Sequence, residues 1–483
     1  MKGADGLGLK IGLEVHCQLT VLNTKLFCSC SSNYRGTEPN TDICEICTGL
    51  PGTLPVLNEK VVEAATKIAL ALNCKIAETA NFFRKNYFYP DLPKNFQITQ
   101  YDKAGGVAIA KEGQIETSEG SIRIRRIQLE EDPGKLSYEG TIVSSPFALV
   151  NYNRAGVALV EIVTEPDLKS PKHAREFLQK LRSILEHIGV CDGSLEGAMR
   201  CDANISLFGG KRVEVKNISS FKEVERALNF EITRQKTMAK AAKAEGMETR
   251  HWDEVRRVTV TLRVKESEED YRYFPEPDLV PITISKNYIS KVKARMPELP
   301  DKRKERFVRD YKVSEEIASV LVGEKQIADF FEACVKSYKA PRLLGSWLAI
   351  DIIGYLNRSE KTFADIKFSP NNLAEIAKLV EQKQITDSSA KTIIIKAIEQ
   401  GKSRFEIGKK EEGAITDEKM VMNAVKMVFG ANRKAVEDAK SDPNAINFLM
   451  GQVMKATKGR ADHSLSRKLI QEELLAVQKP SRK

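Results

Sequence analysis

The spacing of apolar residues changes once along the chain, near residue 296, and this change constrains the fold more than any other feature. Before it, short runs such as residues 11–18 and 257–265 alternate apolar and polar side chains, as strands with one buried face do. After it, apolar residues recur with the 3.6-residue period of packed helices. The pattern predicts an α+β domain with a mixed or antiparallel sheet, followed by an all-α region.

Three amphipathic helices are expected among the strands, near residues 59–72, 170–188 and 220–240. Ser170 is a good N-cap for the second helix, and a capping box that begins at Ser220 starts the third. Strands and helices in this order are typical of an α+β domain with mixed or antiparallel strand pairing.

A separate helical module is expected at the end of the chain, because a polar segment at residues 401–413 interrupts the helical pattern. At about 150 residues per domain, a chain of 483 residues is long enough for about three domains. The net charge is +10, and beyond Met450 there are 8 Lys and Arg against 3 Asp and Glu. This basic tail is either a solvated terminus or a contact with nucleic acid.

Composition and motifs exclude several classes of protein. The chain has no window of about 18 apolar residues, so a membrane span is not expected, and its first residues have no signal or transit character. It lacks a G-x-x-x-x-G-K-[ST] loop, a G-x-G-x-x-G turn, a kinase catalytic loop, an amidase signature and a G-x-S-x-G elbow. We therefore expect a multidomain protein of the cytoplasm.

Four of the nine cysteines are clustered, since Cys28 and Cys30 are followed after thirteen residues by Cys44 and Cys47. Zinc favours four thiolate ligands in a tetrahedron, and two close pairs joined by a turn-rich loop provide them. The alternative is chance clustering. The spacing predicts a zinc-ribbon-like insertion with a closed, structural Zn²⁺ site, because the cluster contains no spare ligand or base.

Polar side chains share one face on several predicted strands. By strand, these faces carry Glu14, His16 and Gln18; Asp202, Asn204 and Ser206; and Arg212, Glu214 and Lys216. We expect a three-residue hairpin loop at residues 208–210, which places Asn204 opposite Glu214. A two-residue Gly-Gly loop would instead put the last two polar sets on opposite faces of the sheet.

Each of these strands alone is also compatible with a sheet surface that faces solvent. Two carboxylates about 4 Å apart repel by roughly 4 kcal/mol at an effective dielectric near 20, so carboxylates gathered around one cleft need a cation. Oxygen ligands with a single His favour Mg²⁺. Two segments rich in Tyr and Pro, residues 87–97 and 271–278, suit either a nucleotide-binding wall or apolar anchors for loops.

Together these segments resemble the B subunit of the tRNA-dependent aspartyl/glutamyl amidotransferase, the GatB family. The matching stretches follow the family's order and lie at residues 12–16, 87–100, 128–135, 152–156, 161–167, 200–206, 213–217, 270–279 and 451–459. The resemblance implies a catalytic cradle domain over residues 1–293, a helical domain over 294–407 and a tRNA-binding tail domain over 408–483.

The resemblance also implies a reaction. Family members are understood to use ATP to phosphorylate the side-chain carboxylate of Glu mischarged on tRNA(Gln), or of Asp on tRNA(Asn), before ammonia displaces the phosphate. The ammonia is expected from a glutaminase A subunit, and a small C subunit completes a heterotrimer. Neither a membrane nor DNA is an expected partner. The alternatives are a non-catalytic zinc-ribbon RNA-binding protein and a metal-dependent nuclease.

The site residues are carried over from the same resemblance. The magnesium ligands are expected at Glu14, His16, Glu131 and Glu214, with Asp202 and Glu130 as further candidates. Of these, Glu14, Glu131 and Glu214 are expected to act in catalysis, and Tyr87, Lys94 and Arg200 to contact ATP or the substrate. Strict alternation along the strand from Gln128 would turn Glu130, not Glu131, to the polar face, so that choice stays open.

Overall fold

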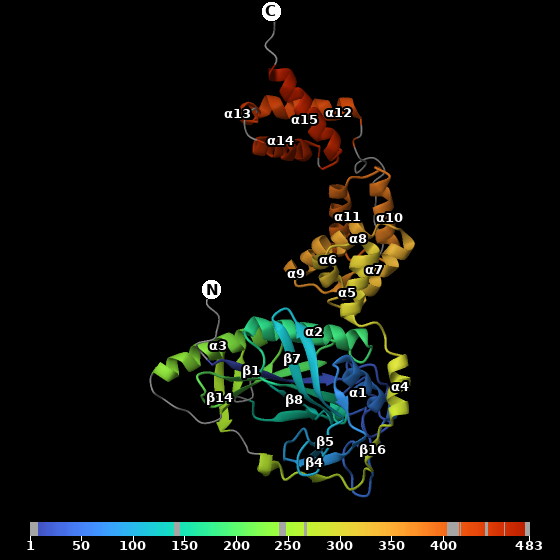
Figure 1. Ribbon diagram of the computed structural model, residues 1–483, viewed down its shortest axis with the longest axis vertical. Helices are drawn as coiled ribbons and strands as arrows, with labels where there is room; N and C mark the ends of the chain where they lie inside the picture. The colour runs from blue at the N-terminus through green and yellow to red at the C-terminus, as the bar shows by residue number, and fades with distance from the viewer. Residues whose placement is uncertain are drawn as a thin grey trace, which may run out of the picture. The chain divides into compact units, whose positions relative to one another are not determined.

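The computed structural model describes residues 8–139, 145–240, 248–264, 268–402, 415, 417–439, 443–457 and 459–478. The chain divides into two compact units, Met1–Pro300 and Asp301–Lys483 (Figure 1). The first unit is built on a large sheet and the second is helical, so the predicted α+β class with a helical C-terminal region is confirmed. The boundary predicted between residues 407 and 408 lies outside the described residues and stays a prediction.

The main sheet of the first unit has β1 (Lys10–Gln18) among its central strands. From edge to edge the order is β14 (Val258–Val264), β13 (Glu248–Asp253), β12 (Val213–Ile218), β11 (Met199–Ser206), β1, β10 (Ala158–Thr164), β7 (Gly120–Glu131), β5 (Phe96–Gln100), β4 (Phe82–Asn86) and β15 (Phe274–Pro275). In addition, β6 (Ala110–Thr117) pairs with β7 and with β2 (Lys75–Ile76). The pairing of β12 with β13 is parallel, and the other strand pairs described in this sheet are antiparallel.

Two short sheets complete the first unit, pairing β3 (Thr79–Ala80) with β16 (Ile282–Thr283) and β8 (Lys135–Tyr138) with β9 (Ala148–Asn151). On β1, Leu13, Val15 and Cys17 are buried in the apolar core. Because side chains alternate along a strand, Glu14 and His16 point to the other face of the sheet. The sheet therefore has an apolar face and a polar face.

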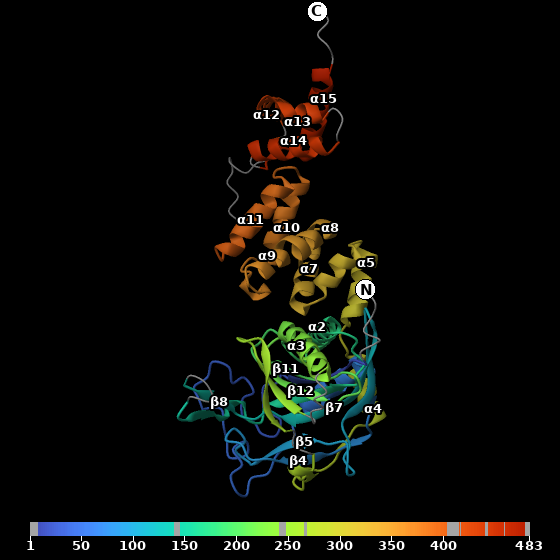
Figure 2. The same cartoon turned by 90° about the vertical axis from the view of Figure 1, so that its left-hand side faces the viewer.

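Helices α2 (Pro171–His187) and α3 (Phe221–Lys240) lie along one face of the sheet (Figures 1 and 2). The side chain of Ser170 accepts a hydrogen bond from the backbone N–H of His173, which confirms the predicted cap of α2. Helix α1 (Glu59–Ala71) packs against β6 and β7, and α4 (Lys286–Ala294) packs against α1.

The register of β11 and β12 decides where their polar side chains lie. Asn204 pairs with Glu214, as a three-residue hairpin loop predicts. The ladder shifts beside Asp202, yet Lys216 Nζ donates a hydrogen bond to Asp202 Oδ2 at 2.7 Å. The predicted pairing of Asn204 with Glu214 is therefore confirmed, although residues 207–212 join the two strands in place of a three-residue loop and the register shifts at Asp202. The polar sets of β11 and β12 share one face of the sheet.

The second unit contains two separate apolar cores. The first core is formed within α5 (Pro300–Tyr311), α6 (Glu315–Leu321), α7 (Lys325–Ser337), α8 (Pro341–Ser346), α9 (Ile353–Arg358), α10 (Pro370–Glu381) and α11 (Asp387–Glu399). The second is formed within α12 (Glu418–Ala431), α13 (Arg433–Asp438), α14 (Pro443–Ala456) and α15 (His463–Gln478). Among the described residues no helix has both the length and the apolar character that crossing a membrane requires.

Candidate active site

A cavity of about 840 Å³ lies on the polar face of the main sheet. Neighbouring strands each contribute a carboxylate to its lining, namely Glu214 from β12, Asp202 from β11, Glu14 from β1, Glu161 from β10 and Glu130 from β7. His16 of β1 also lines it. The sheet thus brings together acidic side chains that are far apart in the sequence.

Short contacts link several of these groups. His16 Nε2 and Glu130 Oε1 lie 3.3 Å apart, and Asn204 Nδ2 donates a hydrogen bond to Glu14 Oε1 at 2.9 Å. Lys216 Nζ lies 3.2 Å from Glu214 Oε1 in addition to its bond with Asp202. Four of the carboxylates of the cavity are therefore each in contact with a nitrogen of a neighbouring side chain.

Burial changes the protonation of the cavity. It raises the pKa of Glu130 to about 8, with the charge of Glu161 as a further cause, and it also raises the pKa of Glu161. Burial, with Arg200 as a second cause, lowers the pKa of His16 to about 3. At neutral pH the imidazole of His16 is therefore neutral and Glu130 retains its proton, and a bound cation would favour loss of that proton.

Glu131 is directed away from this cavity. Its Oε1 accepts a hydrogen bond from the backbone N–H of Ile98 at 2.8 Å, and its Oε2 accepts one from Lys94 Nζ at 2.7 Å. Strand β7 continues to Glu131, so side chains alternate to its end and Glu130 alone of the two lines the cavity. Two of the predicted residues, Glu131 and Lys94, therefore pair with each other.

Arg200 and Tyr87 are near the cavity without being among its lining residues. Arg200, opposite His16 on the neighbouring strand, donates a hydrogen bond to Asp132 Oδ1 at 2.7 Å. The ring of Tyr87 contacts that of Tyr271, which lines the cavity, with their centroids 6.0 Å apart. Burial raises the pKa of the Tyr87 hydroxyl, so this group stays protonated.

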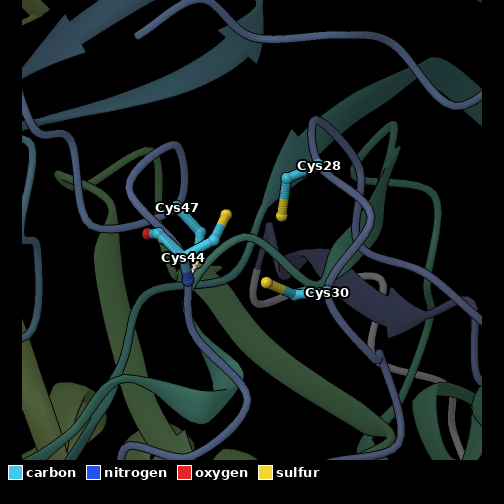
Figure 3. Close-up of side chains that lie close together, drawn as sticks. All are labelled: Cys28, Cys30, Cys44 and Cys47. Atoms are coloured by element: carbon cyan, nitrogen blue, oxygen red, sulfur yellow. Dashed lines mark hydrogen bonds between the residues drawn. The ribbon is translucent and has the colours of Figure 1, made fainter.

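The four clustered cysteines form a second candidate site, and their Sγ atoms all lie within 4.8 Å of one another. Figure 3 shows Cys28 and Cys30 facing Cys44 and Cys47. The thiols are free, and the backbone N–H of Cys44 donates to Cys47 Sγ at 3.2 Å. The prediction that this cluster could hold a metal ion is confirmed. Within the described part of the chain, no other group of three or more ligand atoms lies this close together.

A lysine is buried beside the cysteine cluster. Lys25 is 0% exposed, and its Nζ donates to the backbone carbonyl of Asp42 at 2.7 Å and to Cys47 Sγ at 3.5 Å. A hydrogen bond from Cys28, opposed by burial, lowers the pKa of the Cys47 thiol to about 4. An ammonium beside a thiolate offsets part of the negative charge that four cysteine ligands bring to a divalent ion.

Comparison with known proteins identifies the family. Residues 9–290 match the description "GatB/GatE catalytic domain", and residues 329–474 match "GatB domain". The chain belongs to the GatB family. It is 50% identical over 474 residues to the B subunit of the aspartyl/glutamyl-tRNA(Asn/Gln) amidotransferase of Sulfurisphaera tokodaii, covering 96% of this chain and 99% of the relative. It is 46% identical to the proteins of the same name from Methanococcoides burtonii and Thermotoga maritima, over 96% of this chain and 97% and 98% of theirs.

The GatB resemblance predicted from the sequence is therefore confirmed, and the structure adds two residues that the sequence analysis missed. Glu161 is the single charged residue of β10. A lone charge in a strand of otherwise uncharged residues is the feature by which the sequence could have indicated it as a site residue. Lys85 of β4 lines the cavity and stands immediately before the Tyr-rich segment. We had expected cations at Lys94 and Arg200 instead, and both of these have carboxylate partners.

Proposed function

We propose that this GatB chain activates and amidates the side-chain carboxylate of Glu mischarged on tRNA(Gln), of Asp mischarged on tRNA(Asn), or of both. In the first step a carboxylate oxygen attacks the terminal phosphorus of ATP, the bond to ADP breaks, and an acyl phosphate forms. In the second step the nitrogen of ammonia attacks the acyl carbon, phosphate leaves, and a proton is released. The overall reaction is supported by relatives that are named as the B subunit of an aspartyl/glutamyl-tRNA(Asn/Gln) amidotransferase and align over nearly the whole chain.

The cavity on the polar face supports this function most directly. Phosphoryl transfer depends on positioning and on neutralising charge, and carboxylates from five neighbouring strands line one cavity. We infer that Glu14, His16, Glu130 and Glu214 hold Mg²⁺, with Asp202 and Glu161 beside them. The raised pKa of Glu130 fits this role, because a buried carboxylate with no bound cation retains its proton. When bound, Mg²⁺ would supply neutralisation of the phosphate charge.

This proposal requires several side chains of the cavity to move. The ligand atoms of these residues are not gathered around one point, and Glu130 bonds with His16 while Glu214 bonds with Lys216. Each of these interactions must open for the side chain to turn toward a common ion. The magnesium-binding and catalytic roles expected of Glu131 stay predictions, since that residue would have to release Lys94 and the N–H of Ile98 first.

The roles of Tyr87, Lys94 and Arg200 also stay predictions. The two cations could bind ATP or the substrate only after exchanging their present carboxylate partners. For the cysteine cluster we propose a structural Zn²⁺ ion, because Zn²⁺ favours four thiolates and a compact arrangement of four Sγ atoms requires little closure to bind it.

The proposed reaction also requires partners. A relative that is named as the B subunit of an amidotransferase belongs to an assembly with other subunits. We propose a glutaminase A subunit that supplies ammonia and a small C subunit, and we assign tRNA binding to the tail domain of residues 408–483. The cradle and helical domains would then span residues 1–293 and 294–407.

The decisive experiment combines the full chain with its partner subunits, ATP, Mg²⁺, glutamine and mischarged Glu-tRNA(Gln) or Asp-tRNA(Asn). The amino acid is then released from the tRNA and tested for the amide. We expect Glu14→Ala and Glu214→Ala to lose amide formation while still binding tRNA. Glu116→Ala, an exposed carboxylate on β6, is the matched control and should remain active. RNA cleavage, or tRNA binding without amide formation by the unaltered protein, would contradict the proposal.

A further inference from the structure

Lys85 differs from the other basic residues of the carboxylate cavity. Lys216 has Asp202 and Glu214 as partners, and Arg126 has Asp102 and Glu161. The remaining basic residues of the lining are exposed, namely Lys10, Lys103, Arg125 and Arg212. Lys85 is half-buried and forms no ion pair with any residue that the structure describes.

Aromatic rings hold the Lys85 ammonium in place. Its Nζ lies 4.7 Å from the ring centroid of Tyr271 and 5.5 Å from that of Tyr87. A cation–π interaction attracts the ammonium to the ring without neutralising its charge, and the ring does not replace the oxygen acceptors that the ammonium N–H groups can bind. The ammonium is therefore positioned by the protein and retains its capacity to bind an anion.

The surroundings of Lys85 suit a phosphorylated ligand. On the same face of β4, Phe83 contacts Tyr101, and Tyr101 stacks on Tyr273 with centroids 4.1 Å apart and rings 4° from parallel. Tyr101 and Tyr273 line the cavity together with Lys85. The charge of Lys85 also reaches the carboxylates, because it partly offsets the rise that burial and Glu161 cause in the pKa of Glu130. One cavity thus combines carboxylates for a cation, an aromatic wall and an ammonium without an anionic partner.

We propose that Lys85 binds the phosphoryl oxyanion that passes from ATP to the substrate carboxylate. This inference rests on the function proposed above and adds to it the residue that holds the transferred group. The ammonium stays protonated throughout and donates N–H bonds to phosphoryl oxygens while the phosphorus–oxygen bond to ADP breaks and the one to the carboxylate forms. Tyr87 and Tyr271 act as positioning residues for Lys85.

The test uses the full chain assembled with its partner subunits, and ammonium chloride as the nitrogen source so that glutamine hydrolysis does not limit the rate. Lys85→Met keeps the length of the side chain and removes the charge, and Lys85→Arg keeps the charge. Lys111→Met is the matched control, because Lys111 is exposed on β6 and is not among the residues that line the cavity. For each variant we would measure kcat/KM for ATP, the affinity for tRNA, and the dissociation constant of an ATP analogue with a non-hydrolysable terminal linkage.

A charge-assisted hydrogen bond contributes about 1.5–3 kcal/mol, so Lys85→Met should lower kcat/KM for ATP by roughly 10- to 100-fold. Binding of tRNA should be unchanged, Lys85→Arg should recover part of the loss, and Lys111→Met should behave as the unaltered protein. If Lys85→Met retains full activity and analogue binding, the role of Lys85 is refuted while the proposed function stands. If the unaltered assembly forms no amide, the proposed function fails and this inference fails with it.

A second measurement needs no variant and so does not depend on how Lys85→Met folds. The unaltered assembly is treated with an amine-acylating reagent, with and without the ATP analogue and Mg²⁺, and modification of each lysine is quantified by mass spectrometry. Acylation of Lys85 should fall when the analogue binds, whereas that of Lys111, which lies outside the cavity, should not. Equal acylation of Lys85 in the two samples, with the analogue bound, would overturn the proposal.

Discussion

At the scale of single residues, the burial of Glu130 makes the stability of the fold depend on pH. Its carboxylate is buried against His16, and burial raises its pKa from 4.5 to about 8. Between those two values the unfolded chain has an ionised carboxylate while the folded chain retains a proton. The folded state therefore loses stability as the pH rises through this window, and the full cost is present above pH 8.

Glu130→Gln should remove this cost. Without Mg²⁺ at pH 8, the variant should unfold at least about 2–4 °C above the unaltered protein, as expected if removing even part of this cost adds about 1 kcal/mol, and the difference should shrink toward pH 5. Mg²⁺ should raise the melting temperature of the unaltered protein and not that of the variant. Thermal melts at several pH values check both expectations. If the variant is less stable than the unaltered protein at every pH, the Glu130 side chain stabilises the folded state and the expected cost is refuted.

Single residues of the site differ in how well the sequence predicts them. The alternation of side chains along β1 is enough to place Glu14 and His16 on one face of the sheet. The same alternation, continued to the end of β7, favours Glu130 over Glu131 as the residue on the polar face. It cannot show that Lys94 and Arg200 have carboxylate partners, because Glu131 and Asp132 approach them from other strands or loops. The missing information in each case is a contact between residues distant in sequence.

At the scale of elements, strand order brings the site together and is the part that sequence patterns leave undetermined. The hairpin loop predicts that β11 and β12 pair, with Asn204 opposite Glu214. Nothing local predicts that β1 pairs with both β10 and β11, since those strands begin more than a hundred residues later. This arrangement places Glu14 between Glu161 and Asp202 as neighbours in one cavity.

The cysteine loop is a small element, and we expect its affinity for Zn²⁺ to depend on Lys25. Lys25→Met should lower the affinity for Zn²⁺ by about 10- to 100-fold, because the variant lacks the buried ammonium that offsets the thiolate charge. Lys60→Met, on the exposed start of α1, is the matched control. Competition with a chromogenic chelator measures the affinity, and thiol labelling reports whether the cysteines become accessible. Equal zinc retention in the two variants would contradict a charge-balancing role.

At the scale of the whole molecule, the change of hydrophobic period near residue 296 predicts the division into a sheet unit and a helical unit. The observed units meet at Pro300 and Asp301, and each has its own apolar core. Such a boundary can be predicted because the spacing of apolar residues along the sequence depends on the local secondary structure. The separate core of α12–α15 gives the end of the chain the means to fold without the rest of the second unit.

The basic end of the chain therefore offers a test of the proposed tRNA-binding role. Removal of residues 408–483 deletes a region with its own core and, beyond Met450, 8 basic against 3 acidic residues. The shortened chain should bind tRNA about tenfold more weakly or worse. Its affinity should also depend less on salt: the slope of log affinity against log salt concentration should fall in magnitude by about 0.7–0.9 for each phosphate that it no longer binds. The KM for mischarged tRNA should rise while kcat at saturating tRNA changes little, because the carboxylate cavity lies in the first unit. Titrations of tRNA at several salt concentrations, with the steady-state rates, measure these effects. If affinity and salt dependence are the same with and without residues 408–483, tRNA is bound elsewhere on the chain or by one of its partners.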